Sequence, residues 1–343
     1  MTQIADRTAT PTAAEDAAGL YRLPPASRIG HTHLRVADLK RSLAFYRDVL
    51  GFTVTYETET IAMLAAGGYH HHVGMNTWDS LGGPRPPLGT TGLHHHAIVL
   101  PDRRSLAVAV KRVIDSGHQL TDAQDHGVSE AYYLDDPDGN GVELYIDRPA
   151  ARWPVQPDGS LGLYSVQLEV ADLLVELEPS GGARAEELAD RFRAANAGFA
   201  GFVNSMTDGD WAAPCPKEST TVGVAAHHVA AAYPAVLAKL EAQHRGESVQ
   251  KAPQELLDKA NARHNAAFTG VSVSDVLDGL REGAAPVAAA IRLLTDADLD
   301  RPLVDGAGNP LVPFEAWVHN VAIGHIGAHR SELMEALATR ERR

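Results

Sequence analysis

The stretch HTHLRVADLKRSLA (residues 31–44) recurs in shortened form as HHAIVLPDRRSLA (residues 95–107). In each copy a histidine stands seven residues before an aspartate, and Ser-Leu-Ala follows on a helical pattern. Three strand-like runs come after each copy: VTYE, IAMLAA and HHHVGMN after the first, and HQL, EAYYL and GVELYID after the second. The repeat therefore predicts two modules, each consisting of a strand, a helix and three strands.

Length and composition narrow the class of protein. The chain has 343 residues, of which 44% are hydrophobic and 22% charged, and its net charge is -14. This length indicates two domains, no apolar run approaches the roughly 20 residues of a membrane span, and the acidic charge repels nucleic acid. The single cysteine, Cys215, and the lack of an apolar segment in residues 1–27 favour a cytoplasmic protein.

The order of the segments predicts an α+β fold in which paired βαβββ modules are followed by an all-α four-helix bundle. Residues 1–27 are rich in Ala, Thr, Pro and acids and are predicted to be a flexible leader. The two modules fill residues 28–148. Proline- and glycine-containing turns then mark residues 149–183 as a linker or extension, whose apolar stretch LYSVQLEVADLLVEL is expected to pack back on the modules.

The helical bundle is predicted over residues 184–341. Its first helix is indicated by an apolar stripe whose residues are spaced by four and three positions. They are Leu188, Phe192, Ala195, Phe199, Phe202 and Met206. Helical patterns continue at about 219–244, 253–268, 274–294 and 314–339, separated by Gly-, Pro- and Asp-rich turns. This count fits a four-helix bundle with one extra helix.

Histidines are unusually frequent, with 17 in the chain, and those of the modules suggest a metal site. Alternate side chains of a strand share a face, so His31, His95 and Glu143 stand on the polar faces of their strands. If the modules pair into one curved sheet, all three line its concave side. Two imidazoles and one carboxylate form the facial triad suited to non-haem Fe(II) or Mn(II).

The end of the second module carries a longer motif. It reads His126-x6-Tyr133-x2-Asp136-Pro137-x-Gly139-x3-Glu143 and nearly reproduces the extradiol dioxygenase signature, with Tyr132 in place of the usual aliphatic residue. Residues 28–148 therefore resemble the vicinal oxygen chelate superfamily, which includes glyoxalases, bleomycin-resistance proteins and extradiol ring-cleavage dioxygenases. The motifs look like those of catechol 2,3-dioxygenase-type members.

This resemblance implies a set of roles. His31, His95 and Glu143 would hold Fe(II) or Mn(II), a catechol-like aromatic substrate would chelate the metal, and dioxygen would take the remaining position. His126 would act as acid and base, and Tyr133 would hydrogen-bond a substrate oxygen. The same scaffold carries isomerases and lyases.

Glyoxalases usually have a fourth ligand on the strand equivalent to residues 70–72, and the internal offset of the repeat places His71 there. A four-ligand site would favour isomerase chemistry over oxygen activation. The other histidines of the modules are interpreted as structural: His33, His70, His72, His94, His96 and His118.

A second metal site is predicted in the bundle. His325 and His329 are four residues apart on the apolar stripe of the last helix, so they share a face one turn apart. In the helix near residues 222–240, His228 flanks the buried stripe, whereas His227 points almost the opposite way. His228 is therefore the predicted third ligand. Cys215 lacks an activating motif and is interpreted as structural.

The histidine motifs of the bundle, AAHHVA (residues 225–230) and HIGAHRSEL (residues 325–333), carry a resemblance of their own. They look like the DinB-like family and its relative, the metal-binding domain of mycothiol-dependent maleylpyruvate isomerases. The resemblance covers about residues 184–340. It implies a divalent metal, Zn(II) or Ni(II), and a role in thiol transfer with a low-molecular-weight thiol.

Three functions follow as hypotheses. The leading one is an Fe(II)-dependent extradiol dioxygenase that opens a catechol-like ring. The second is a glyoxalase-like isomerase, lyase or thiol (mycothiol) transferase, and the third is a non-catalytic protein that binds an aromatic metabolite and confers resistance. The scaffold also implies a homodimer.

Overall fold

The computed structural model describes residues 14–15, 20–250 and 252–341. The chain divides into two compact units, Met1–Thr90 with Pro137–Gly139, and Thr91–Asp136 with Asn140–Arg343. The division falls inside the predicted 28–148 segment, so that the second module shares a unit with the helices. Most of the predicted leader lies outside the described residues; two of its segments pair as short strands, β1 (Ala14–Glu15) and β2 (Tyr21–Arg22).

The first unit contains one βαβββ module. Its sheet has the order β3-β6-β5-β4, in which β3 and β6 are parallel and the other pairs antiparallel. Phe45, Tyr46, Leu64 and Met75 are buried in its core. The elements are β3 (Thr32–Arg35), α1 (Leu39–Leu43), the π-helix η1 (Ala44–Val49), β4 (Thr53–Glu57), β5 (Ile61–Ala65) and β6 (Val73–Asn76).

The second unit repeats this module and extends it. Its sheet has the order β11-β8-β9-β10-β7, with β7 and β10 parallel. The added strand β11 (Val166–Gln167) comes from the predicted linker and pairs with β8. The module consists of β7 (His95–Val99), α2 (Arg103–Asp115), β8 (Leu120–Asp125), β9 (Ser129–Asp135) and β10 (Gly141–Asp147). The predicted order of strand, helix and three strands is confirmed in both copies.

The aspartate of each repeat has a structural role. Asp38 accepts a hydrogen bond from the backbone N–H of Arg41, and Asp102 accepts one from the backbone N–H of Ser105. Each aspartate therefore caps the N-terminus of its helix, where the first N–H groups have no partner within the helix. In both modules the helix begins shortly after the first strand ends, and the aspartate is the residue directly before the helix.

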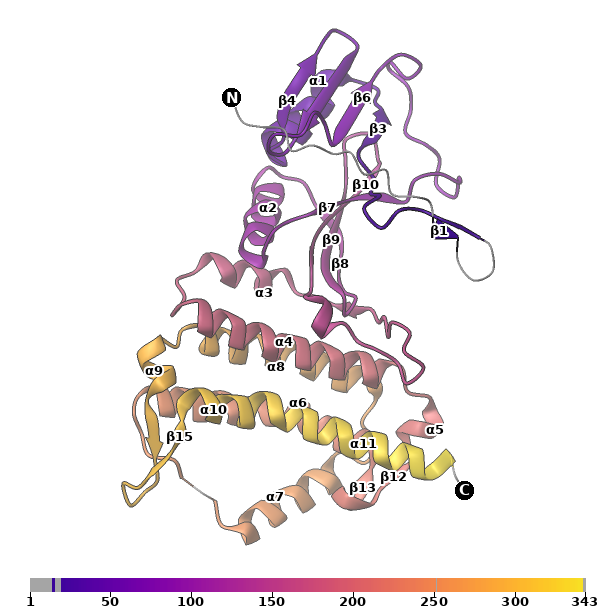
Figure 1. The fold of residues 1–343 in the computed structure, drawn as a ribbon. Helices are drawn as coiled ribbons and strands as arrows, with labels where there is room; N and C mark the ends of the chain where they lie inside the picture. Colours follow the sequence, from indigo (N-terminus) through magenta and orange to yellow (C-terminus); the bar gives the residue numbers. More distant parts are fainter. Residues whose placement is uncertain (1–13, 16–19, 251, 342–343) are drawn as a thin grey trace. The chain divides into compact units, whose positions relative to one another are not determined.

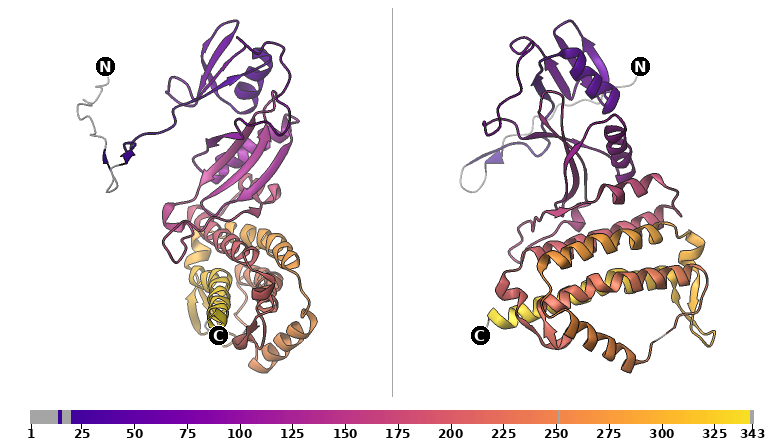
Figure 2. Two further views of the ribbon diagram at one scale, coloured as in Figure 1. Left: turned by 90° about the vertical axis from the view of Figure 1, so that its right-hand side faces the viewer. Right: turned by 180° about the vertical axis from the view of Figure 1, so that it is seen from behind.

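Long helices make up the rest of the second unit. In Figures 1 and 2 α4 and α8 form one layer, the pair α6 and α11 forms the next, and α7 lies beyond that pair. Leu188, Phe192 and Phe199 of the predicted stripe are fully buried in the shared core. None of the helices in the described ranges has the length and apolarity to cross a membrane.

The helices of this region, in chain order, are α3 (Val170–Leu174), α4 (Ala183–Asn204), α5 (Asp208–Trp211), α6 (Val222–His244), α7 (Gln254–Ala267), α8 (Val273–Arg292), α9 (Asp296–Asp300), α10 (Phe314–Val318) and α11 (His325–Glu341). Between them lie short strands, β12 (Pro214–Cys215), β13 (Thr220–Thr221), β14 (Pro302–Val304) and β15 (Pro310–Pro313), and the 3-10 turns η2 (Ala150–Arg152), η3 (Val175–Leu177) and η4 (Pro216–Glu218). The predicted single helix over 314–339 is interrupted by a π-helix, η5 (His319–Gly324).

Buried charges join the second module to the helices. Glu176 in η3 accepts hydrogen bonds from Arg103 of α2 at 2.5 Å and from Arg193 of α4 at 2.8 Å, and it lies 3.2 Å from Arg292 of α8. Glu130 of β9 pairs in turn with Arg103 and with a further arginine, Arg148. Burial alone would raise the pKa of Glu130, but the guanidinium groups of Arg103 and Arg148 outweigh it and hold this pKa at about 2.

Replacing Glu176 tests this arrangement. Glu176→Ala removes the one carboxylate that three buried arginines share, although Arg103 keeps Glu130 and Arg193 keeps Asp190. Breaking a buried ion pair typically costs about 3–5 kcal/mol. We expect a clear fall in the midpoint of urea or thermal unfolding. The matched control is Asp115→Ala, which removes the exposed Lys111–Asp115 pair and should cost less than about 1 kcal/mol. Equal effects of the two substitutions would contradict this account.

Candidate metal centres

Three of the predicted residues of the first site stand together on the sheet of the second unit. Because β9 and β10 are antiparallel, Tyr133 stands directly opposite Glu143, and such cross-strand partners project from the same face. Because β7 is parallel to β10 with His95 opposite Gly141, His95 lies on that face two positions from Glu143. A Cβ at Gly141 would collide with the carbonyl oxygen of His94, so this close approach requires glycine.

A continuous line of polar contacts results. Nε2 of His95 is 3.0 Å from Oε2 of Glu143. The hydroxyl of Tyr133 donates to Oε1 of Glu143 over 3.1 Å and lies 3.0 Å from Nε2 of His126. An imidazole nitrogen and a carboxylate oxygen this close form a donor set that fits a shared divalent metal such as Fe(II) or Mn(II).

Tyr133 is held in its protonated form. Its partial burial, reinforced by the charge and hydrogen bond of Glu143, raises the pKa of Tyr133 above that of an ordinary phenol. The hydroxyl therefore remains a hydrogen-bond donor at neutral pH.

This line of residues borders a cavity of 480 Å³, whose lining includes His95, Asp122, His126, Tyr133 and Ser165. The volume lies within the range of about 300–1,000 Å³ that is typical of small-molecule sites. The cavity can therefore accept a small organic molecule whose polar atoms face His126 and Tyr133.

His94 is a functional candidate that the sequence reasoning treated as structural. Its Nδ1 lies 2.8 Å from Nδ1 of His95, so one of these nitrogens carries a proton that the other accepts. A metal-binding histidine usually fixes its ring through the nitrogen that faces away from the metal. In a continuous strand His94 and His95 would project from opposite faces, but β7 begins at His95, and His94 lies before the strand.

The two remaining candidates of the first site lie in the first unit. The rings of His31 and His71 have their centroids 4.3 Å apart, and Nδ1 of His71 is 2.6 Å from Nδ1 of His70. Burial, followed by the proximity of His31, lowers the pKa of His71. His31 thus belongs to one unit and His95 and Glu143 to the other, so the three-ligand set remains a prediction, as does His71 as the fourth ligand.

The bundle brings its three predicted histidines together. One ring nitrogen from each of His228, His325 and His329 can be chosen so that all three lie within 4.8 Å of one another. Among the described residues no other group of three or more histidine, cysteine or acidic side chains meets this spacing. Three imidazoles at such distances fit a divalent metal such as Zn(II) or Ni(II).

The electrostatic environment keeps these histidines neutral. Burial, followed by repulsion from the neighbouring histidines, lowers the pKa of both His228 and His325 to about 4. Neutral imidazole is the form that binds a metal. At neutral pH the nitrogen lone pairs of the cluster are therefore available.

Further residues surround this cluster. His227, predicted to point away from the stripe, stacks on His264 of α7 with ring centroids 5.0 Å apart, and His264 also meets His228 edge-on at 5.3 Å. Glu332 places a carboxylate oxygen 3.5 Å from Nδ1 of His329. No sequence pattern pointed to His264, because α7 lies far along the chain from the three histidines of the cluster.

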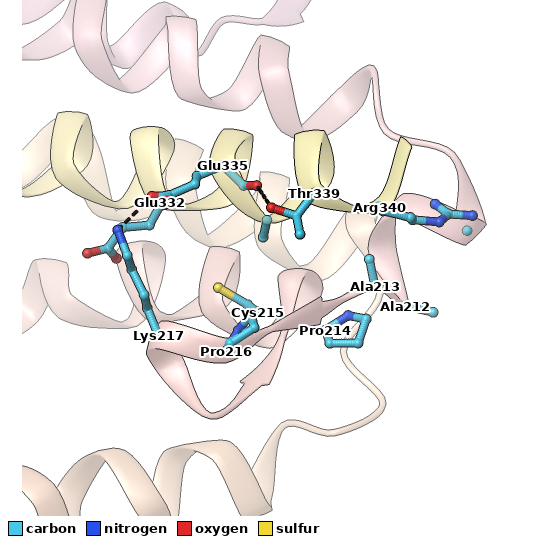
Figure 3. A pocket seen from close by; sticks show the side chains of 12 residues that line it. Ala212, Ala213, Pro214, Cys215, Pro216, Lys217, Glu332, Glu335, Thr339 and Arg340 are labelled. Carbon is cyan, nitrogen blue, oxygen red and sulfur yellow. Dashed lines mark hydrogen bonds and ion pairs between the residues drawn. The ribbon is translucent and has the colours of Figure 1, made fainter. Parts of the chain in front are cut away.

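A cavity of 510 Å³ lies along α11 beyond the cluster (Figure 3). Glu332 lines this cavity, as does Cys215 of β12, which is buried. Lys217, which follows Cys215 and also lines the cavity, reaches across to α11 and donates to Glu335 over 2.6 Å. The cavity is thus separate from the three histidine rings but shares Glu332 with their surroundings.

Comparison with known families agrees with this organisation. Residues 28–144 match the Glyoxalase/Bleomycin resistance protein/Dioxygenase superfamily, and residues 191–333 match the DinB superfamily. The chain therefore carries a vicinal oxygen chelate domain followed by a DinB domain, as the motifs predicted. Proteins of both kinds bind divalent metals.

Individual relatives match the first of these domains. A catechol-2,3-dioxygenase of Bacillus subtilis is 39% identical over 44% of this chain and 52% of its own length. A biphenyl-2,3-diol 1,2-dioxygenase of Rhodococcus globerulus is 34% identical over 35% of this chain and 63% of its own length. This chain thus spans half to two thirds of these relatives. A lactoylglutathione lyase of Escherichia coli O157:H7 is 28% identical over 36% of this chain and 96% of its own length.

The pKa values of the bundle histidines predict a pH dependence for the metal-free protein. The pKa of His228 and of His325 is about 4 in the folded chain, whereas an unfolded histidine has a pKa of about 6.5. Between these values the unfolded chain binds more protons, so stability is lost as the pH falls from about 6.5 towards 4.

We expect the unfolding temperature of the chelator-treated chain to fall over this pH range. The double variant His228→Gln/His325→Gln should fall less steeply, because the groups that take up protons on unfolding are gone. Parallel curves for the two proteins would contradict the assignment. Adding Zn(II) at pH 7 should raise the unfolding temperature of the natural chain more than that of the variant.

Proposed function

We propose that the chain is an Fe(II)-dependent extradiol-type dioxygenase that opens a catechol-like aromatic ring. The observation that carries this proposal is the line of contacts from His95 through Glu143 and Tyr133 to His126. Three of these residues, His95, Tyr133 and His126, line a cavity of 480 Å³. The similarity to dioxygenases that act on catechol and biphenyl-2,3-diol supports it over the same residues.

In this proposal each residue has a separate task. His95 and Glu143 hold the metal, with His31 as the third ligand predicted from the sequence. When bound, the metal supplies open coordination positions for the vicinal oxygens of the substrate and for dioxygen. The protonated hydroxyl of Tyr133 donates a hydrogen bond to a substrate oxygen. His126 takes the proton of a substrate hydroxyl and later returns it.

Glu143→Ala tests the metal site. It removes the only carboxylate of the proposed ligand set, so we expect iron content to fall and oxygen uptake with a panel of simple catechols to drop to background. Both are measured on protein loaded anaerobically with Fe(II). His118→Ala, which changes a histidine interpreted as structural, is the control and should leave both unchanged. Retained oxygen uptake in Glu143→Ala would overturn the proposal.

His126→Gln separates proton transfer from metal binding. Because His126 does not bind the metal in this proposal, the variant should keep its iron while kcat falls by roughly 10²–10⁴-fold, the usual contribution of a general acid or base. Loss of iron from this variant would show that His126 is a ligand and not an acid or base.

The contact between His71 and His31 in the first unit supports a second candidate function, a glyoxalase-like isomerase. His71 lies against His31, where a fourth ligand of a glyoxalase-like isomerase would be, and the lactoylglutathione lyase matches along 96% of its own length. Turnover of a thiol hemithioacetal under anaerobic conditions, together with silence towards catechols, would favour this isomerase. Tight binding of an aromatic ligand to metal-free protein without any turnover would favour a binding protein.

For the bundle we propose a divalent metal, Zn(II) or Ni(II), held by His228, His325 and His329. The close spacing of their ring nitrogens and the lowered pKa values of His228 and His325 support this site. Thiol transfer is the activity proposed for it. The Zn(II)-dependent rise in unfolding temperature, present in the natural chain and reduced in the histidine variant, tests the metal site independently of the dioxygenase.

A further inference from the structure

We infer that His227 of α6 and His264 of α7 form a further divalent-metal site, separate from the cluster of His228, His325 and His329, and that the ion bound there fastens α7 to the bundle. Neither the proposed dioxygenase nor the proposed three-histidine site is needed for this pair to bind an ion. Three observations support it: the distance between two ring nitrogens, the groups that surround them, and the way in which α7 is attached.

The two ring nitrogens face each other at a distance that suits a shared metal ion. Nδ1 of His227 lies 3.4 Å from Nε2 of His264. A tetrahedral Zn(II) has Zn–N bonds of about 2.0–2.1 Å, which places two ligand nitrogens about 3.3–3.4 Å apart. The observed distance exceeds the range of about 2.7–3.2 Å that is usual for hydrogen bonds from N–H groups to oxygen. The pair can therefore take up an ion with little movement of either helix.

The surroundings of the pair favour a bound cation. Phe268, directly after α7, packs against both rings, with its ring centroid 3.9 Å from that of His227 and 4.9 Å from that of His264. Apolar packing around a metal site limits the access of water and strengthens the attraction between the ion and its ligands. The carboxylate of Asp275, in the first turn of α8, lies near enough to His227 for the two charges to interact. Its negative charge attracts a divalent ion.

The ligand chemistry defines the class of ion. Imidazole nitrogen suits Zn(II), Ni(II) and Cu(II). A four-coordinate ion held by two histidines keeps two further positions for water or for a small ligand. With one imidazole fewer, this site is weaker than the three-histidine cluster and fills after it as the metal concentration rises.

The attachment of α7 gives such an ion a structural effect. None of the described residues of α7 is buried, and in Figure 1 this helix lies beyond the pair α6 and α11. Side-chain hydrogen bonds of Gln254, Lys259 and Arg263 stay within the helix. Most helices are held in place by a buried apolar face, which α7 lacks, so a metal bridge from His264 to α6 adds strongly to its attachment. Because His264 also meets His228 edge-on, the fastened helix stands beside the three-histidine cluster.

The number of Zn(II) ions bound per chain tests the inference. The full chain is freed of metal by a chelator and dialysed against a series of Zn(II) concentrations at pH 7. His264→Gln changes a helix without buried residues, and we expect it to bind one Zn(II) fewer than the natural chain. His228→Gln/His325→Gln should also lose one ion, and the variant that combines all three substitutions should lose two. The matched control is His244→Gln, which removes the imidazole at the end of α6 and should lose none.

The size of the change separates a ligand from a neighbour. Removing even an indirect partner of a metal ligand typically lowers affinity about 10–100-fold, so His264→Gln should weaken the corresponding step of the zinc titration by more than about 100-fold. Zinc binding equal to that of the natural chain would show that the pair is an ordinary hydrogen bond, and it overturns the inference. Loss of two ions from His264→Gln also overturns it, because His264 would then support the three-histidine cluster instead of holding an ion of its own.

Amide hydrogen exchange provides a readout in α7 itself. We expect Zn(II) to slow exchange in residues 254–267 of the natural chain and of His244→Gln, but not in His264→Gln. Exchange in α7 that does not respond to Zn(II) in the natural chain overturns the inference. Unfolding temperatures of the metal-free proteins show that each variant is folded.

Failure of the proposed three-histidine site gives a different result. In that case the natural chain and His228→Gln/His325→Gln bind the same number of Zn(II) ions. The difference between the natural chain and His264→Gln, together with the exchange of α7, then still decides whether His227 and His264 hold an ion.

Discussion

The buried carboxylate of Glu176 is the interaction on which the second unit depends. Its oxygens meet arginines of three helices, Arg103 of α2, Arg193 of α4 and Arg292 of α8. A buried charge is tolerated only with its partners in place, so α2, which packs on the sheet, and the two helices of the bundle are held in one arrangement. The same buried region extends through Glu130 and Arg148 to Asp125, which directly precedes His126.

The position of α4 against the second module also affects the candidate site of that module. With α4 held against the module, Gly201 receives the ring of Tyr164, and the chain that follows brings Ser165 to His126. From His126 the contacts continue through Tyr133 to Glu143 and His95. The sheet formed by β8, β9 and β10 thus serves two purposes. The buried charges of Asp125 and Glu130 lie on one face, and the cavity lies on the other.

The sequence predicted what depends on local periodicity. Strand alternation grouped His95 with Glu143, and helical spacing grouped His325 with His329, because each grouping follows from the geometry of one element or its pairing. The Glu176 cluster, the His94 contact with His95 and the contact of Ser165 with His126 were not predicted. Each depends on how distant segments dock or on where a strand begins, and the π-helix before His325 likewise has no signal in the apolar stripe.

The two proposed metal sites have donor sets of different charge, because the first contains the carboxylate of Glu143 and the bundle site consists of three neutral imidazoles. In the proposed functions this difference favours a different reaction at each site. A carboxylate beside imidazole lowers the net charge on a bound divalent ion, which favours electron transfer from the metal to oxygen. Three neutral imidazoles leave the full divalent charge, which favours polarising a bound group. The lowered pKa values of His228 and His325 keep protons from competing for that set, whereas Glu143 is already engaged by the hydroxyl of Tyr133. Zn(II) in the first site would therefore lack the electron transfer that the proposed reaction needs, because Zn(II) has no redox chemistry, whereas the bundle site would keep the full divalent charge with either metal.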